Sequence, residues 1–195
     1  MPEPLNYRQE IYRKLIHLSS SCIPFMLWYF GKDIFQPWII SLAIILAILD
    51  HGRRHNKFLY RIYSDLFTTF TRPIEQGILS GASWVIIGAA VTIFIFNENI
   101  AIIGLLVLSI SDSAAAIVGI KYGKTQLFSK SLEGSAAFFI TATIIVFSLS
   151  SAAAYVNFIA VIAATVVELF STPRINDNLL IPMALALILT IGGVG

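Results

Sequence analysis

Residues 111–135 hold the main concentration of reactive side chains in this chain. Asp112 follows a predominantly apolar run, residues 100–110. Three lysines come after it, at Lys121, Lys124 and Lys130. A carboxylate inside a membrane helix costs about 2.5–3.5 kcal/mol on insertion scales, so its presence usually indicates a function. Lysines, glycines and a helix N-terminus beside a carboxylate are what a phosphate-bearing ligand needs. We therefore expect a functional site in this segment.

Asp112 leaves two interpretations open. It is either a buried carboxylate paired with a lysine among closely packed helices, or a ligand for Mg²⁺ or a base for a hydroxyl group. Ala116, Gly119 and Gly123 follow on its helix face. These small residues leave room either for a ligand or for a close helix neighbour.

Gly119 to Thr125, with the sequence GIKYGKT, is one residue short of a P-loop. It also leaves a membrane helix rather than a strand, so we reject a Walker A site. Glycines still allow a close backbone approach, and the three lysines can neutralise phosphates. The alternative is that these lysines only anchor a cytoplasmic loop.

Two further groups of polar residues lie next to apolar spans. Lys130, Ser131, Glu133 and Gly134 stand where a helix is expected to start, and its free N–H groups favour either an anion or a simple cap. The second group has helical i, i+3, i+4 and i+7 spacing, which places it on one face. Its members are Glu10, Arg13, Lys14 and His17. The second group is either part of a site or a surface ion pair with a buried histidine.

Composition predicts the elements that position these residues. The chain of 195 residues is 57% hydrophobic and 12% charged, which is typical of a membrane protein rather than a soluble core. A transmembrane helix needs about 20 apolar residues, so about seven fit. We predict an all-α polytopic bundle forming a single domain, 1–195, with Pro24 kinking the first span. The predicted spans are 15–30, 34–50, 79–96, 100–119, 134–150, 153–170 and 179–194.

Basic residues predict the orientation of these spans. Of the thirteen Lys and Arg residues, all except Lys32 fall on one side of a seven-span chain. The positive-inside rule then places the N-terminus in the cytoplasm. The longest loop, 51–72, reads as an interfacial amphipathic helix. Charges of both signs converge on this face, which predicts a site for a polar headgroup and a metal nucleotide; they include Asp50, Arg53, Arg72, Glu75, Glu168, Asp177 and Asn178.

Several classes of function are excluded by the same sequence. A net charge of +2 is too small to argue for nucleic acid. Cys22 is the only cysteine, so no internal disulfide forms. There is no His/Cys cluster with zinc spacing and no G-x-S-x-G elbow. We expect no cleavable signal, because the first apolar run lacks a small-residue cleavage pattern.

Short motifs occur in a fixed order from one end of the chain to the other. They are Glu10-x-x-Arg13-Lys14-x-x-His17, Asp50-x-x-Arg53, Arg72-x-x-Glu75 with Gly81-Ala82, Asp112-x-x-Ala115, Gly119-x-x-x-Gly123-Lys124, Lys130-Ser131-x-Glu133-Gly134-Ser135 and Asp177-Asn178 before Ile181-Pro182. In this order they resemble the motifs of the CTP-dependent lipid kinases, the family that includes dolichol kinase, phytol kinase and the fungal-type CTP-dependent diacylglycerol kinase. Ser111 departs from the pattern, since a glycine often precedes the aspartate.

The resemblance implies transfer of a phosphoryl group from CTP, with Mg²⁺, to the hydroxyl of a membrane lipid alcohol. Phytol-type alcohols, polyprenols and diacylglycerol all remain open as substrates. It implies a site on the cytoplasmic face, in the plasma membrane if the source is prokaryotic. The implied catalytic residues are Asp112, Glu133 and His17. The implied nucleotide-binding residues are Lys121, Gly123, Lys124, Lys130, Ser131, Arg13 and Lys14. The implied metal ligands are Asp112, Glu133 and Asp177.

Two alternatives remain. Phosphatidate cytidylyltransferases share the order of the central motifs, but they should carry a later Lys-Arg…Lys-Asp signature, whereas Arg174 is the only basic residue after Glu133. A small ion-coupled transporter would use Asp112 as an ion site. It would also need polar residues facing one another across several spans, and spans 79–96 and 134–150 offer only Ser and Thr as candidates.

Overall fold

The computed structural model describes residues 14–53, 55–56, 58, 60–61, 79–128, 130–171 and 176–193. Over these residues the protein is all-α apart from one short hairpin, which the sequence did not predict. A helical turn at 14–19 comes first. The elements that follow are α2 (Cys22–Phe30), α3 (Lys32–Gly52), α5 (Gly81–Ile95), α6 (Glu98–Leu106), the π-helix η2 (Val107–Ser111), α7 (Asp112–Tyr122), β1 (Gln126–Leu127), β2 (Lys130–Ser131), α8 (Leu132–Leu149), α9 (Ala154–Phe170) and α10 (Asp177–Ile191).

Each predicted span coincides with helix in the structure. Within the described residues, three helical stretches are long and apolar enough to cross a membrane: α3, the continuous run Glu98–Tyr122, and α8. The helices α5, α9 and α10 are apolar but shorter. The all-α fold is therefore confirmed, whereas seven complete crossings stay a prediction.

The first span is interrupted as its proline predicted. Helix ends at residue 19 and resumes at Cys22. Pro24 has no N–H to donate to the carbonyl of Ser20, and that carbonyl instead accepts from the Ile23 N–H at 2.9 Å. The helix axis can therefore change direction between the polar turn 14–19 and α2.

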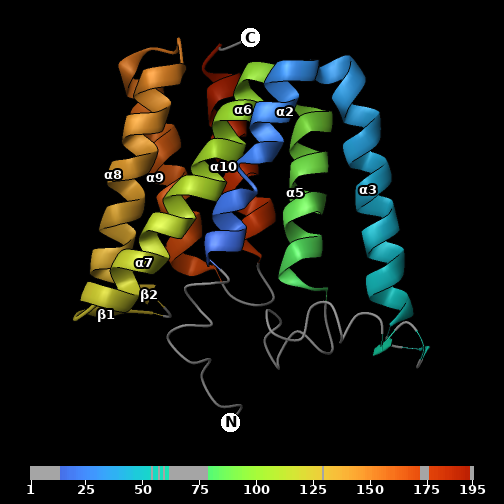
Figure 1. Ribbon diagram of the computed structural model, residues 1–195. Helices are drawn as coiled ribbons and strands as arrows, with labels where there is room; N and C mark the ends of the chain where they lie inside the picture. Colours follow the sequence, from blue (N-terminus) through green and yellow to red (C-terminus); the bar gives the residue numbers. More distant parts are fainter. Residues whose placement is uncertain are drawn as a thin grey trace.

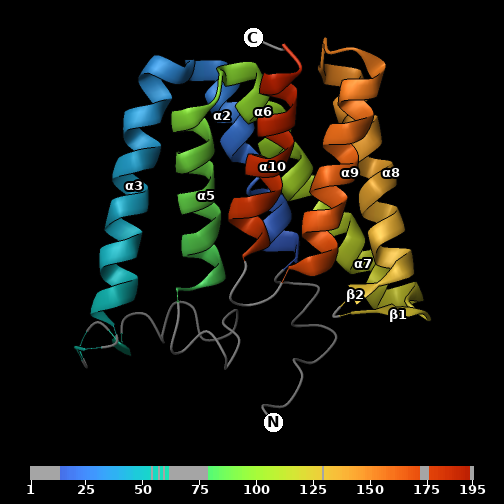
Figure 2. The same cartoon turned by 180° about the vertical axis from the view of Figure 1, so that it is seen from behind.

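The helices run up and down, so the loops gather at two ends (Figure 1). The start of the first helix, the hairpin and the N-terminus of α10 lie at the lower end, as the reverse view also shows (Figure 2). The connections α2–α3, α5–α6 and α8–α9 lie at the upper end. This alternation brings residues 14, 112, 130 and 177 to the same half of the molecule.

Two apolar cores hold the bundle together. One is built from α6, η2, α8, α9 and α10 around Phe138 and Leu185. The other joins α2, α3, α5 and α6 around Leu27 and Ile93. Backbones approach closely where glycine removes the side chain: a Cβ on Gly88 of α5 would stand 2.2 Å from the carbonyl oxygen of Asn178 at the start of α10. Such contacts set the height at which α10 begins.

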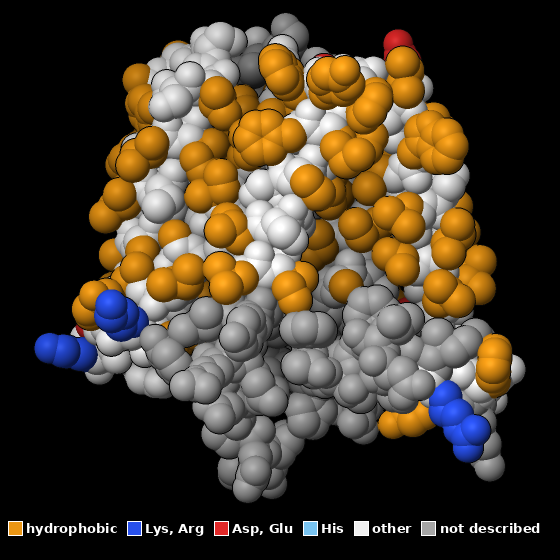
Figure 3. All heavy atoms as spheres, in the orientation of Figure 1, with side chains coloured by type: hydrophobic (Ala, Val, Ile, Leu, Met, Phe, Trp, Pro, Cys, Tyr) orange, Lys and Arg blue, Asp and Glu red, His pale blue; other side chains and the backbone are white. Residues whose placement is uncertain are grey.

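The outer surface is that of a membrane protein. Large apolar side chains are exposed on several helices; Trp38 of α3, for example, is 73% exposed. In Figure 3 hydrophobic side chains cover the upper part of the molecule, and Lys and Arg appear at its lower edge. Lys32 is the described basic residue at the upper end, where it donates to the carbonyl of Phe96. The amphipathic helix predicted at 51–72 lies largely outside the described residues.

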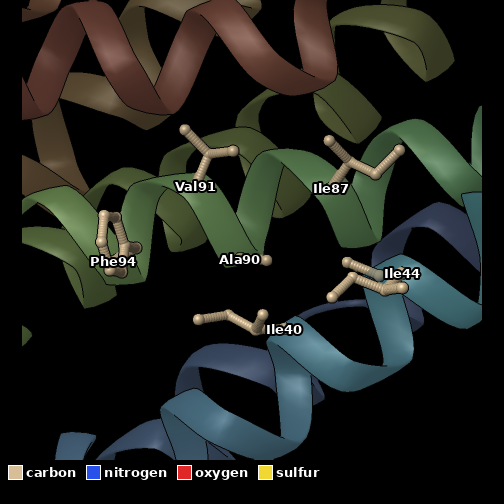
Figure 4. Close-up of a pocket in the computed structure, with 7 residues that line it drawn as sticks. Ile40, Ile44, Ile87, Ala90, Val91 and Phe94 are labelled. Carbon is tan, nitrogen blue, oxygen red and sulfur yellow. The ribbon is translucent and has the colours of Figure 1, made fainter.

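An apolar hollow of about 340 Å³ lies between α3 and α5 (Figure 4). Its lining offers no polar group, so it carries no chemistry of its own. The lining residues are Ile40, Ala43, Ile44, Ile87, Ala90, Val91 and Phe94.

Candidate functional site

Asp112 begins α7 directly after the five-residue π-helix η2. Its side chain is buried, and its Oδ2 accepts a 2.6 Å bond from Nζ of Lys14. Single π-helical turns inside α-helices are rare and frequently mark functional positions. Ser113 braces this turn, since its hydroxyl donates to the Ser109 carbonyl at 2.6 Å. The lysine pairing expected of a buried carboxylate is therefore present, within a backbone distortion that the sequence did not predict.

His17 meets the same carboxylate. Its Nε2 lies 3.2 Å from Oδ2 of Asp112, one turn along from Lys14 on the same helix face. The angle between them does not make a hydrogen bond, so this buried Nε2 has no hydrogen-bond partner among the described residues. The buried hydroxyl of Ser111 is in the same condition. Buried polar atoms without partners are uncommon in native proteins and call for an explanation.

Lys130 forms the second half of the site. Its Nζ lies 3.1 Å from Oε1 of Glu168 and 3.6 Å from Oδ2 of Asp177. Burial lowers the pKa of the Lys130 ammonium, but Asp112, Asp177 and Glu168 together outweigh that effect and raise its pKa above the usual range. Asp112 heads the three carboxylates in this effect, so Lys130 links the Asp112 region electrostatically to α9 and α10. Lys130 thus stays charged throughout the neutral pH range.

The hairpin explains how Lys130 reaches the site. β1 and β2 pair antiparallel, with Leu127 opposite Lys130. The side chain of Ser131 caps α8 by accepting from the Gly134 N–H at 3.1 Å. Glu133 accepts from the Thr125 N–H through both oxygens, at 3.2 and 3.3 Å. These bonds tie the chain before the hairpin to the first turn of α8.

The glycines predicted near Asp112 pack against α8. A Cβ on Gly134 would stand 2.8 Å from the Ala115 carbonyl oxygen of α7. A Cβ on Gly119 would stand 2.9 Å from Oγ of Ser131. Of the two uses open to these small residues, the structure shows the close helix neighbour.

A separate polar cluster joins the lower ends of α3 and α5. Asp50 accepts from Nε of Arg53 and, at 2.6 Å, from the backbone N–H of Ser80. Ser80 in turn caps α5 through the Ser83 N–H. The other expected members of this motif, Arg72 and Glu75, lie outside the described residues.

The structure therefore brings together part of the predicted set. Lys14, His17 and Asp112 meet directly, and Lys130 meets Asp177. Lys121 and Lys124 are exposed; Lys121 lies over the Tyr122 ring with Nζ 5.1 Å from its centroid. Gly123 ends α7. Arg13 lies outside the described residues.

Glu168 is the residue to which sequence reasoning assigned no role. Its only signal was a carboxylate near the end of an otherwise apolar span, and the structure buries it to 1% exposure at Lys130. Among the described residues, no group of three or more His, Cys, Asp or Glu side chains is arranged to hold a metal ion. Mg²⁺ usually takes one or two carboxylates together with substrate phosphates. Asp112 and Asp177 supply that smaller donor set.

Comparison with known proteins places the chain among membrane lipid kinases. No family model matches it. No solved structure matches it significantly. An uncharacterized protein of Methanocaldococcus jannaschii is 34% identical over 93% of both chains.

Two relatives carry names that describe an activity. The CTP-dependent diacylglycerol kinase 1 of Saccharomyces cerevisiae is 34% identical over 70% of this chain and 49% of its own length. The dolichol kinase sec59 of Schizosaccharomyces pombe is 26% identical over 93% of this chain and 38% of its own. The chain thus spans about half or less of the length of these two kinases. Together with the motif order, these similarities show that the chain belongs to the CTP-dependent lipid kinase family.

Proposed function

We propose that this protein transfers the γ-phosphoryl group of CTP to the hydroxyl of a membrane lipid alcohol. The observation that carries the proposal is the meeting of Lys14, His17 and Asp112 inside the lower half of a membrane bundle. CTP as the donor and a lipid as the acceptor follow the names of the relatives. Phytol-type alcohols, polyprenols and diacylglycerol are all acceptors of the required kind.

Phosphoryl transfer demands positioning and charge neutralisation more than covalent chemistry. Lys14 and Lys130 supply ammonium groups that can pass from carboxylates to phosphate oxygens. Lys121, Lys124 and Arg13, with the backbone at Gly123 and the α8 N-terminus at Ser131, extend the phosphate-binding surface on the same side.

Asp112 is placed either to hold Mg²⁺ or to accept the hydroxyl proton of the lipid. His17 shares the second task, because its free Nε2 lies beside Asp112. Asp177, and Glu133 at the edge, would hold or orient the ion. Bound Mg²⁺ supplies charge neutralisation at the β- and γ-phosphates.

The depth of Asp112 supports a lipid rather than a soluble acceptor. It lies within the stretch Glu98–Tyr122, which can cross a membrane. A lipid hydroxyl anchored at the headgroup level can reach such a position without leaving the bilayer. Exclusion of water from the same place limits wasteful hydrolysis of the nucleotide.

The test is a product analysis with purified protein. The protein is incubated with Mg²⁺, each of the four nucleoside triphosphates in turn and a panel of lipid alcohols, and products are identified by mass spectrometry. We expect CDP and a lipid monophosphate from CTP. Release of pyrophosphate with a CDP-lipid would instead identify a cytidylyltransferase, and absence of any lipid product would contradict the proposal.

A further inference from the structure

Glu168 makes two separate contacts with its two carboxylate oxygens. Oε1 lies 3.1 Å from Nζ of Lys130, which comes from the hairpin. Oε2 accepts a 2.9 Å hydrogen bond from Oγ of Ser135, in the first turns of α8. Glu168 itself belongs to α9, near its C-terminal end. One buried carboxylate therefore joins three elements at the site.

A buried carboxylate is an expensive way to join helices. Removing a charge from water costs several kcal/mol, and a well-packed apolar group in its place is often neutral or stabilising. The surrounding core of α8 and α9 is apolar, with Ala164 and Phe138 fully buried. A charge at this position is therefore best explained by what it does to Lys130, whose ammonium would otherwise be free to extend toward solvent.

The geometry around Lys130 defines a direction. An ammonium group has three N–H donors and no acceptor. Glu168 lies within hydrogen-bonding distance of one donor, and Asp177 of α10 approaches from a neighbouring helix at 3.6 Å. With two carboxylates on one side, the remaining donor capacity faces away from α9 and α10. Asp112, on α7, is the carboxylate with the largest electrostatic effect on this lysine.

We infer that Glu168 is a positioning residue for the kinase reaction: it holds the Lys130 ammonium against the site so that the ammonium meets the nucleotide phosphates in a fixed place. Ser135 keeps the Glu168 carboxylate turned toward Lys130. Glu168 itself touches neither nucleotide nor lipid. This inference rests on the proposed function, and it assigns the reaction a residue that acts through Lys130.

The decisive variant is Glu168→Gln, which removes charge but keeps shape. The amide oxygen can still accept from Lys130, and the amide N–H can donate to the Ser135 hydroxyl, which both donates and accepts. Only the charge on the contact is lost. We expect the KM for CTP to rise roughly tenfold, since charge-assisted hydrogen bonds are about twice as strong as neutral ones. The KM for the lipid should be unchanged.

A double-mutant cycle separates positioning from a general structural role. If Glu168 acts only through Lys130, Glu168→Gln combined with Lys130→Gln should be no worse than Lys130→Gln alone. Additive losses would overturn the inference, as would a Glu168→Gln variant with the parent's KM and kcat. Glu98→Gln is the matched control, because Glu98 also accepts a buried-side contact, from the Lys32 N–H, but at the opposite end of the bundle.

A second readout does not depend on catalysis. Because Glu168 raises the pKa of Lys130, Glu168→Gln should expose more neutral amine and speed acylation of Lys130 at mildly alkaline pH. Mass spectrometry of the labelled protein measures this rate, with the exposed Lys124 as an internal reference. Unchanged labelling of Lys130 would contradict the contact itself. A parent protein without kinase activity would instead contradict the proposed function, whatever the labelling shows.

Discussion

Two buried carboxylates at the lower end of the bundle have opposite surroundings. Asp50 is satisfied locally: Arg53, three residues away, and the Ser80 N–H take its two oxygens. Asp112 is paired with Lys14 from the other end of the sequence, and the neighbouring His17 Nε2 and Ser111 hydroxyl have no partner among the described residues. The difference teaches that satisfied polar clusters secure helix ends, whereas incompletely satisfied ones are where a ligand can bind.

The largest effect should come from the incompletely satisfied cluster. Asp112→Asn is nearly isosteric and should leave the protein folded. Losing a metal-binding or general-base carboxylate should reduce kcat by roughly 10²–10⁴. Steady-state kinetics together with a melting curve in detergent test this, and near-normal turnover would make Asp112 a second structural carboxylate.

The same substitution at the satisfied cluster should act on stability. Asp50→Asn leaves the Arg53 guanidinium buried without its counter-charge, and breaking a buried pair in this way costs about 3–5 kcal/mol. We expect a lower Tm in detergent and a smaller fraction of folded protein. Activity per folded molecule should fall far less than for Asp112→Asn. Equal loss of specific activity in the two variants would erase the contrast between the clusters.

Two lysines sharpen the contrast at the level of nucleotide binding. Lys130 is held by carboxylates, whereas Lys124 is exposed. A lost charge-assisted contact is worth about 1.5–3 kcal/mol, so Lys130→Gln should weaken nucleotide binding about ten- to a hundredfold. Lys124→Gln should have an effect of the same sign if it also contacts phosphate.

Arginine variants give the control for these lysines. At a phosphate site arginine should rescue only partly, because its planar fork differs in shape from an ammonium group. At a loop that only anchors topology arginine should rescue fully. Well-inserted glutamine variants with the parent's KM and kcat for CTP would remove both lysines from the site.

The smallest perturbation tests whether the two clusters share one face of the membrane. In a Cys22→Ala background, single cysteines at Asn56, Thr125 and Asn97 report the Asp50 end, the Asp112 end and the opposite end. Because all Lys and Arg residues but Lys32 fall on one predicted side, Asn56 and Thr125 should label from the same side and Asn97 from the other. Labelling of Thr125 and Asn97 from one side would reject the predicted topology. Activity should be unaffected throughout.

Much of this arrangement followed from local patterns. Apolar runs predicted each helix, because burying or exposing to lipid about 20 apolar residues leaves helix as the way to satisfy the backbone. Helical spacing placed Lys14 and His17 on one face, and both indeed meet Asp112. Pro24 predicted the break before α2. The number of membrane crossings stays a prediction, since α5, α9 and α10 are short.

Other features depended on contacts between distant segments. The π-helical turn before Asp112 leaves no signature in residue types. The glycines of α7 were compatible with either a ligand or a helix, and only the approach of α8 decided between them. The partnership of Lys130 with Glu168 depends on the rotation of α9 about its axis, which a single helix does not reveal.

The sequence by itself determined which groups are present and on which end of the bundle they lie. Its apolar lengths, its basic asymmetry and its motif order were sufficient for an all-α membrane protein and for the lipid kinase family. The tertiary structure alone decided which ammonium meets which carboxylate, and which polar atoms are left without a partner. The physical reason is that periodicity specifies a face within one helix, whereas ion pairs between helices depend on how faces from distant segments are packed together.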